Sequence, residues 1–392
     1  MEDVEVRRLL PAEPAPRTVR RGATGLYVHL PFCASRCAYC TFVTSTELGV
    51  LPRTISALRR ELEVLGKRGG RPLRTLYFGG GTPSLVPGHL LGELFRVLDL
   101  YFPRVPGAEV TLEANPDDVT AERAAEWSRL GVNRVSVGVQ AFSDPVLGML
   151  NRRHSAEQAR AAAVLLQGVG FSLSLDLMLG LPGMAEEALA GTVAQALRLR
   201  PGHISVYLLE TDKPHALARL AARRPDLFPD GDAAAHQYLT VGRALVRAGY
   251  RHYEISNFAL PGREARHNLR YWLRLPVLSA GLAAHGHSGR RRWAAPDDLP
   301  AYLAAAEAGR LPRAWSRSLD VAEAMKEGVM LGLRLARGVA RERIEPCLRA
   351  VPAFRDRLED FLALGLARDA GGRVRLTPRG WLVSNELFAA LW

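Results

Sequence analysis

The sequence predicts an α/β fold in which six βα units form a partial, open TIM-like barrel, followed by a mainly helical, winged-helix-like C-terminal domain. Short aliphatic and β-branched runs alternate with amphipathic helical segments, without a break, from about Gly25 to Leu208. In the region 296–392, helical patterns instead follow one another with only one short strand-like run. Six units leave an eight-unit barrel two strands short, so we expect the sheet to stay open.

The predicted strands are short runs bounded by turn-forming residues. They are Leu26–Leu30, Arg74–Phe78, Glu109–Glu113, Arg134–Gln140, Ser172–Leu177 and His203–Leu208. The predicted helices between them carry apolar residues at three- to four-residue spacing. They are Arg53–Leu65, Pro87–Leu98, Ala121–Leu130, Ala156–Gly168 and Glu186–Arg198.

After Gly249 the pattern becomes irregular, with one further predicted strand at Arg251–Ser256 and an Arg-, His- and Gly-rich stretch up to Trp293. The predicted C-terminal elements are helices at Leu299–Glu307, Val321–Arg334, Arg341–Leu348 and Pro352–Leu362, a strand at Val374–Leu376 and a final helix from Pro378. We therefore divide the chain into an N-terminal tail (1–23), a barrel with an extension (24–295) and a C-terminal domain (296–392).

The composition is that of a globular protein with a sizeable core. The chain has 392 residues, of which 48% are hydrophobic, enough for one large and one smaller domain. The segment Met1–Gly22 is rich in Pro and Arg and lacks the apolar core of a signal peptide, and no run of eighteen apolar residues occurs. We expect a cytoplasmic protein without a membrane span, in a compartment that keeps its thiols reduced.

The net charge of +12 raises the question of a nucleic-acid partner. Only three of the 52 basic residues are lysines, and the short arginine clusters carry few aromatic residues between them. An anionic small molecule explains the surplus equally well, so we do not expect nucleic acid as a partner.

Three of the four cysteines, Cys33, Cys37 and Cys40, are separated by only three and two residues. A disulfide framework is disfavoured because such scaffolds are short and rich in cysteine. A zinc site would need a fourth ligand, which neither Cys347 nor His29 supplies at the paired spacing of a finger or ribbon. A [4Fe-4S] cluster on three thiolates, with one iron left for an external ligand, fits this spacing best.

Polar residues also gather where the predicted strands end. Gly79–Pro83 follows the second strand, Glu113 ends the third, Gln140 ends the fourth, Asp176 lies near the end of the fifth and Glu210 follows the sixth. The carboxyl ends of barrel strands meet at one rim, where the chemistry of such folds is found. Polar groups in apolar strands are costly to bury without a partner, so we expect a common ligand there.

The cysteine spacing, with Tyr39 before the last cysteine, resembles the hallmark of the radical S-adenosylmethionine superfamily. From about Gly25 to the C-terminus, the chain is similar to its oxygen-independent coproporphyrinogen III oxidase-like branch. The resemblance implies a [4Fe-4S] cluster on Cys33, Cys37 and Cys40 whose open iron binds S-adenosylmethionine. One electron from the cluster can then cleave that cofactor to a 5′-deoxyadenosyl radical.

Further positions match the family one by one. Gly80, Gly81 and Thr82 match its GGGTP segment, where absent side chains and exposed N–H groups allow close approach to the cofactor. The resemblance also implies contacts to S-adenosylmethionine from Tyr27, Tyr39, Glu113, Gln140, Arg152 and Asp176. A carboxylate can pair with hydroxyl or amino groups, and an arginine with a carboxylate. Taken alone, the glycine segment is also compatible with a tight turn after a strand. Each of Glu113, Gln140, Arg152 and Asp176, taken alone, is also compatible with a surface ion pair.

Two features separate members of this branch. The oxidase carries another cysteine two residues after the third cluster cysteine, whereas Thr41 and Phe42 follow Cys40 here. The segment His267–Trp272 matches the HNxxYW motif of the haem chaperones of the branch, the HemW group, and Tyr253–Phe258 and the C-terminal tail are also similar to that group. The resemblance therefore implies a haem chaperone.

The motif residues implied to bind haem are His267, Asn268, Tyr271 and Trp272. Imidazole is a common axial ligand of haem iron, aromatic rings offer flat faces and arginines can meet propionates. A histidine in an irregular loop is nevertheless more often a structural residue. His285 and His287 are rival ligands, and the sequence does not choose between them.

We therefore expect a protein that binds haem and transfers it to an acceptor protein, with an electron donor for its cluster. The alternative is an oxygen-independent coproporphyrinogen III oxidase, against which the missing cysteine counts. A radical RNA-modifying enzyme is suggested only by the net charge. Whether the chain is an enzyme and whether it forms a homodimer are left open, and Cys347 is expected to be a buried structural residue.

Overall fold

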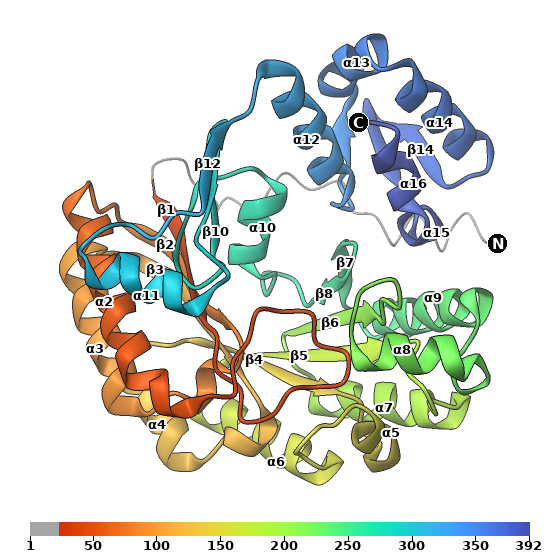
Figure 1. Ribbon diagram of the computed structural model, residues 1–392. Coiled ribbons are helices and arrows are strands. Elements are labelled where there is room, and N and C mark those ends of the chain that lie inside the picture. The colour runs from red at the N-terminus through yellow and green to blue at the C-terminus, as the bar shows by residue number, and fades with distance from the viewer. Residues whose placement is uncertain (1–22) are drawn as a thin grey trace.

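Six strand–helix units form the first half of the structure, a computed structural model that describes residues 23–392 (Figure 1). Each strand pairs in parallel with the next, so the six carboxyl ends lie at one edge of the sheet. The strands are β1 (Thr24–Leu30), β2 (Leu73–Gly80), β3 (Arg104–Ala114), β4 (Arg134–Gln140), β5 (Ser172–Leu179) and β6 (His203–Leu208). The predicted open α/β fold is confirmed; the expectations for Met1–Gly22 lie outside the described residues.

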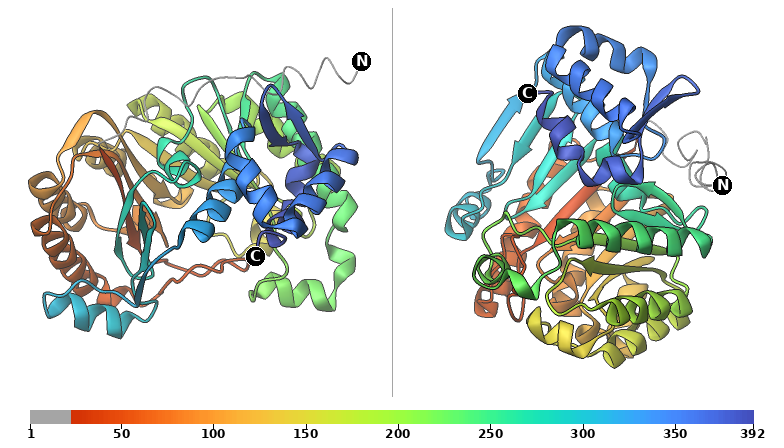
Figure 2. Two further views of the ribbon diagram at one scale, coloured as in Figure 1. Left: turned by 90° about the horizontal axis from the view of Figure 1, so that it is seen from above. Right: turned by 90° about the vertical axis from the view of Figure 1, so that its right-hand side faces the viewer.

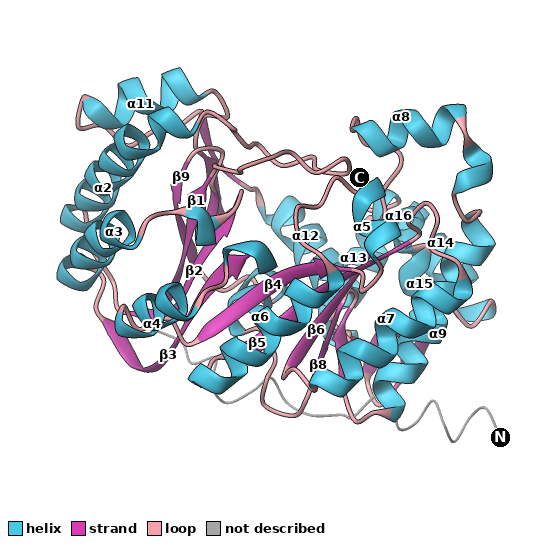
Figure 3. Cartoon of the chain, turned by 90° about the horizontal axis from the view of Figure 1, so that it is seen from below, coloured by secondary structure: helices cyan, strands magenta, loops and turns pink. Residues whose placement is uncertain are grey.

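Helices cover the outer face of this curved sheet (Figure 3). They are α2 (Leu51–Lys67), α3 (Gly88–Tyr101), α4 (Ala121–Arg129), α5 (Asp144–Met149), α6 (Ala156–Val169) and α7 (Glu186–Leu199). Leu26 and Val28 of β1 belong to the same buried cluster as Ile55 and Leu58 of α2. Because side chains alternate along a strand, Tyr27 and His29 of β1 point to the opposite, inner face. This alternation leaves the inner face for the polar residues of the site.

The sheet is wider than predicted, because the region after β6 adds six more strands to it. Its order is β12-β11-β10-β9-β1-β2-β3-β4-β5-β6-β8-β7, open at both ends. The added elements are α8 (Ala216–Arg223), α9 (Gly231–Arg247), β7 (Arg251–Glu254), β8 (Asn257–Ala259), α10 (Arg266–Trp272), β9 (Val277–Gly281), β10 (His285–Ser288), β11 (Arg291–Ala294), α11 (Leu299–Glu307) and β12 (Trp315–Ser318). The expectation of an irregular stretch up to Trp293 is therefore corrected. Strands of three to five residues are too short for a clear alternating pattern.

The C-terminal unit is mainly helical, as predicted. It consists of α12 (Val321–Leu333), β13 (Val339–Ala340), α13 (Arg341–Ala350), α14 (Pro352–Ala363), β14 (Ala367–Ala370), β15 (Arg373–Leu376), α15 (Pro378–Leu382) and α16 (Ser384–Ala389). Its three strands form a separate antiparallel sheet, and it has a hydrophobic core of its own. The unit lies beside α9 and α10, as the two turned views in Figure 2 show. Its residues Trp381 and Ser384 line a cavity together with Gly80 and Asp176, near the carboxyl ends of the parallel strands.

The division of the chain after residue 295 stays a prediction. Two elements that follow it are attached to the barrel side: β12 pairs with β11, and α11 packs on α2. The separate core of the C-terminal unit begins further along, at Val329. We propose that a boundary near Leu319 describes this packing better than one at residue 295.

Candidate functional site

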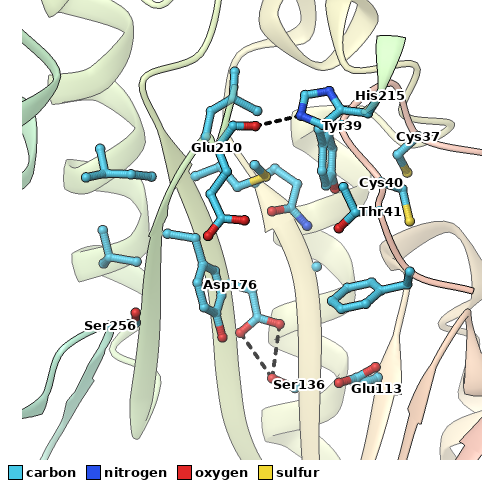
Figure 4. A pocket seen from close by; sticks show the side chains of 18 of the residues that line it. Cys37, Tyr39, Cys40, Thr41, Glu113, Ser136, Asp176, Glu210, His215 and Ser256 are labelled. Atoms are coloured by element: carbon cyan, nitrogen blue, oxygen red, sulfur yellow. Dashed lines mark hydrogen bonds between the residues drawn. The ribbon is translucent and has the colours of Figure 1, made fainter. Parts of the chain in front are cut away.

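A cavity of about 540 Å³ lies at the carboxyl edge of the parallel strands (Figure 4). We call it the cysteine cavity, because Cys33, Cys37 and Cys40 all line it. The residues predicted to bind S-adenosylmethionine line the same cavity, with the exception of Tyr27: they are Tyr39, Gly80, Gly81, Thr82, Glu113, Gln140, Arg152 and Asp176. Residues from six successive βα units thus converge on one space because their strands are parallel and in sequence order.

Backbone hydrogen bonds hold the cysteine loop across the mouth of the barrel. Cys33 N–H donates to the Ser45 carbonyl at 3.0 Å, and Ala38 N–H donates to the Leu150 carbonyl at 3.0 Å. Two side chains reach the sulfur atoms: Thr82 Oγ1 donates to Cys33 Sγ at 3.4 Å and Arg152 Nη1 to Cys37 Sγ at 3.3 Å. Both donors favour sulfur that carries negative charge, as a metal-bound thiolate does.

The donor chemistry of this loop fits a [4Fe-4S] cluster. All four cysteines in the range 23–392 are free thiols, and three of them face one cavity. No helix or strand lies between Cys33 and Cys40, so the loop can draw its sulfur atoms together around a cluster. In residues 23–392 no set of three His, Cys, Asp or Glu side chains is already arranged around a metal position. Burial raises the pKa of the Cys33 and Cys40 thiols, so a bound cation is needed to hold them as thiolates.

Two glycines, at the end of β2 and directly after it, lie very close to the chain just before the cysteine loop. Gly80 has a φ of 111°, and a Cβ on it would lie 2.5 Å from the His29 ring. A Cβ on Gly81 would lie 2.6 Å from the Phe32 carbonyl oxygen, just before the first cysteine. These positions therefore need glycine so that the end of β2 can lie against the end of β1 and against Phe32, which precedes the cysteine loop.

Glu113 is a buried carboxylate at the base of the cavity. It accepts hydrogen bonds from the Tyr77 hydroxyl at 2.7 Å and from the Gly80 N–H at 3.1 Å. Burial, and to a smaller extent the negative charge of Asp176, raises the pKa of Glu113 to about 7. Near neutral pH this side chain can therefore accept or hold a proton.

Asp176 provides the second carboxylate of the cavity. Ser136 Oγ lies 3.2 and 3.1 Å from its two oxygens, as the dashed lines in Figure 4 show. Burial raises the pKa of Asp176 as well. Two acidic side chains thus face the same space from neighbouring parts of the sheet.

Arg152 is the buried cation that faces them. Its Nη2 donates to Asn115 Oδ1 and to the Gly138 carbonyl, both at 2.7 Å, while Nη1 reaches Cys37. Gln140, beside it, has a φ of 65°, and this left-handed backbone conformation changes the direction of the chain at the end of β4. The arginine therefore ties the end of β4 to the cysteine loop.

Tyr27 does not line the cysteine cavity. Its hydroxyl lies 3.0 Å from His29 Nδ1, and its ring is 6.1 Å from the Tyr77 ring and 6.4 Å from the His267 ring, measured between centroids. It therefore lies between the cysteine cavity and the His267–Trp272 segment. Its predicted contact with S-adenosylmethionine stays a prediction.

Sequence reasoning missed the part of the cavity wall that the C-terminal unit provides. Arg334, Trp381 and Ser384 line the cysteine cavity together with Tyr238 and His215. No local pattern marks Arg334 and Trp381, because they reach the cavity only when the C-terminal unit packs on the barrel. Arg334 also lies over the Trp272 ring at 4.7 Å, which links this wall to the His267–Trp272 segment.

A second cavity, of about 420 Å³, lies between α10, β10, β11 and α12. We call it the motif cavity, because Asn268, Tyr271 and Trp272 line it; its other lining residues are His287, Arg292, Glu327 and Leu331. Glu327 forms ion pairs with Arg274 and Arg292, so its charge is compensated. The structure thus separates the HNxxYW residues from the cysteine loop.

His267 is the one predicted haem residue that does not line the motif cavity. It is 2% exposed and stacked on Tyr77. Its Nδ1 lies 2.9 Å from Thr75 Oγ1 and its Nε2 lies 3.4 Å from the Tyr271 hydroxyl. Burial lowers the pKa of His267 to about 3. This environment is that of a neutral imidazole with both nitrogens engaged.

Known proteins are similar to this chain in sequence. A model of the radical SAM superfamily matches residues 27–196, and a model of the HemN C-terminal domain matches residues 319–383. The chain is 38% identical over 373 residues to the heme chaperone HemW of Mycobacterium tuberculosis (strain CDC 1551 / Oshkosh), with 94% of each chain covered. The chain belongs to the HemW family.

A second heme chaperone and one solved structure are also similar to this chain. The heme chaperone HemW of Escherichia coli K12 is 39% identical over 265 residues, which cover 67% of this chain and 69% of that one. The solved structure of coproporphyrinogen III oxidase (HemN) from Escherichia coli superposes with a TM-score of 0.81 at 22% identity, covering all of this chain and 93% of that one. That similarity confirms the fold. Of the helices in residues 23–392, none is both long and apolar enough to cross a bilayer.

Proposed function

We propose that this protein binds haem and passes it to an acceptor protein, with a [4Fe-4S] cluster and S-adenosylmethionine held in the cysteine cavity. Relatives from Mycobacterium tuberculosis and Bacillus subtilis that match over more than 90% of the chain are described as heme chaperones. The observation that carries the proposal is the separation of the two cavities. A protein that holds a cluster and also carries haem needs two spaces, and Trp272 and Cys37 line different ones.

In the cysteine cavity, the three thiols would hold the cluster and leave one iron open. Bound together, the cluster and S-adenosylmethionine supply one-electron chemistry. Gly80 and Gly81 let the end of β2 approach His29 and Phe32 closely. Glu113 and Asp176 can accept hydrogen bonds from hydroxyl or amino groups. Arg152 fixes the loop to the end of β4 and keeps a positive charge beside Cys37.

In the motif cavity, Tyr271 and Trp272 offer aromatic faces to a flat ligand. Arg292 lines the same cavity and can meet a carboxylate on the ligand. A cavity of this size lies within the range of about 300–1,000 Å³ that is typical of ligand pockets.

The test is an anaerobic haem titration of the cluster-reconstituted full chain, followed by the Soret absorbance. The wild type should bind haem saturably, and Trp272→Ala should weaken binding by about tenfold, since one aromatic contact contributes about 0.5–1.5 kcal/mol beyond its buried area. Trp315→Ala, on the exposed strand β12, is the matched control and should bind like the wild type. Absence of saturable binding by the wild type would refute the proposal and favour a test of coproporphyrinogen decarboxylation.

The oxidase alternative has less support at the site. Phe42, 66% exposed, lines the cysteine cavity at the position where the oxidase carries its additional cysteine. The identity of the haem acceptor, an electron donor for the cluster, a homodimer and a cytoplasmic location stay predictions.

A further inference from the structure

Three histidines lie near the HNxxYW segment, and the structure distinguishes them. His267 has a partner within hydrogen-bonding distance of each ring nitrogen and is 2% exposed. His285 is exposed at the start of β10 and packs edge-on against Trp315, away from the motif cavity. Only His287 lines the motif cavity.

His287 is held in the way that suits a metal-binding imidazole. It lies in β10 opposite Arg292 of β11 and is 7% exposed. Its ring hydrogen-bonds to the backbone of Leu275, while Nε2 is buried and has no hydrogen-bond partner in residues 23–392. Metal-ligating histidines are typically oriented by one ring nitrogen on a backbone carbonyl or carboxylate, which leaves the other nitrogen for the metal.

A second orphaned polar atom lies at the same cavity. Trp272 Nε1 is buried and also lacks a hydrogen-bond partner among the described residues. Buried polar atoms without a partner are rare in folded proteins, and a missing ligand is one explanation for them. The free nitrogen of His287 can bind a metal, and the Trp272 N–H needs an acceptor, so the two suit a ligand that carries a metal and an acceptor group.

We propose that His287 Nε2 is the protein ligand of the haem iron. This assignment rests on the proposed haem-binding function and selects one of the two rivals that the sequence left open. Because Nε2 is shielded, iron reaches it by displacing a neighbouring side chain. Tyr271, whose ring centroid lies 5.5 Å from that of His287, is such a neighbour on the cavity wall. His267, whose Nδ1 lies 2.9 Å from Thr75 Oγ1 of β2, then acts as a positioning residue that holds α10 in place.

The test compares the spectra of ferric haem bound to the cluster-reconstituted full chain. His287→Gly should lose the histidine-ligated Soret and electron paramagnetic resonance signature, and added imidazole should restore it. His287→Met should give a different, thioether-type signature. His285→Ala is the matched control on the same strand and should keep the wild-type spectrum.

The outcomes separate this inference from the proposed function. If the wild type binds no haem, the proposed function fails. If the wild type binds haem but His287→Gly and His287→Met keep its spectrum, only the assignment of His287 fails. A loss of the signature in His267→Asn, with an unchanged spectrum in His287→Gly, would assign the iron to His267 instead.

Discussion

Glu61 provides a sharp test of how burial controls the stability of this fold. It lies in α2, is fully buried, and joins three elements. Its Oε2 accepts hydrogen bonds from the Gly281 N–H of β9 at 2.8 Å and from the Tyr302 hydroxyl of α11 at 2.9 Å. Arg313 lies 3.7 Å from Oε1. Burial raises the pKa of Glu61 to about 7 from its ordinary 4.5, although these partners act in the opposite direction.

The sign of the pH dependence follows from that pKa. The folded state binds the Glu61 proton more tightly than the unfolded chain does, so this contribution to stability is present below pH 4.5 and is lost as the pH rises to about 7. At about 1.4 kcal/mol for each tenfold change in proton affinity, the raised pKa corresponds to about 3 kcal/mol. Roughly 2.5 kcal/mol of this is lost between pH 5 and pH 8.

The substitution Glu61→Gln removes the charge and keeps an oxygen that can accept both hydrogen bonds. We expect the effect of Glu61→Gln on the free energy of unfolding to be more favourable at pH 8 than at pH 5 by about 2.5 kcal/mol. Urea unfolding of both proteins under anaerobic conditions at the two pH values measures this difference. Glu63→Gln, which removes the same charge from a partly exposed position of α2, is the control. An effect of Glu61→Gln that is equal at both pH values would refute the reasoning.

Two further predictions concern the cysteine cavity. Arg152→Met should lower the iron content after cluster reconstitution and destabilise the fold by about 3 kcal/mol, since charged hydrogen bonds to Cys37, Asn115 and Gly138 are lost. Iron analysis and urea unfolding measure both effects, and Arg160→Met, whose side chain is 38% exposed and pairs with Glu157, is the control. Gly81→Ala should lower the free energy of unfolding by about 1–3 kcal/mol, because its Cβ would meet the Phe32 carbonyl oxygen at 2.6 Å. Wild-type stability and iron content in this variant would contradict the close approach. Gly92→Ala, where a Cβ meets only Leu130 at 3.9 Å, is the control.

The regular part of the fold was predictable because its signals are local. The strands β4 and β6 begin and end at the predicted residues, Arg134–Gln140 and His203–Leu208. Each is a short buried run followed by a turn, and that pattern is contained in a few consecutive residues. The strand β9 was not predicted, because its partner β1 lies far away in the sequence and five residues carry little pattern of their own.

The residues of the candidate site also fall into those that could be predicted from the sequence and those that could not. Strand-end residues such as Glu113 and Asp176 could be selected because parallel strands bring their carboxyl ends together. Arg334 and Trp381 could not, since they reach the cysteine cavity only through the packing of the C-terminal unit. The hydrogen bonding of His267 could not be predicted either, because a motif specifies residue types and does not specify which ring nitrogens form hydrogen bonds.

The six βα units, the cysteine loop and the resemblance to a family could be recognised in the sequence, since each depends on residues close together along the chain. The packing of distant segments places Asn268, Tyr271 and Trp272 at a second cavity. It also leaves His287 Nε2 there without a hydrogen-bond partner among residues 23–392. Both depend on β10, α10 and α12 meeting in space. The physical reason is that hydrogen-bond partners and burial are properties of the packed chain, and no run of residues specifies them alone.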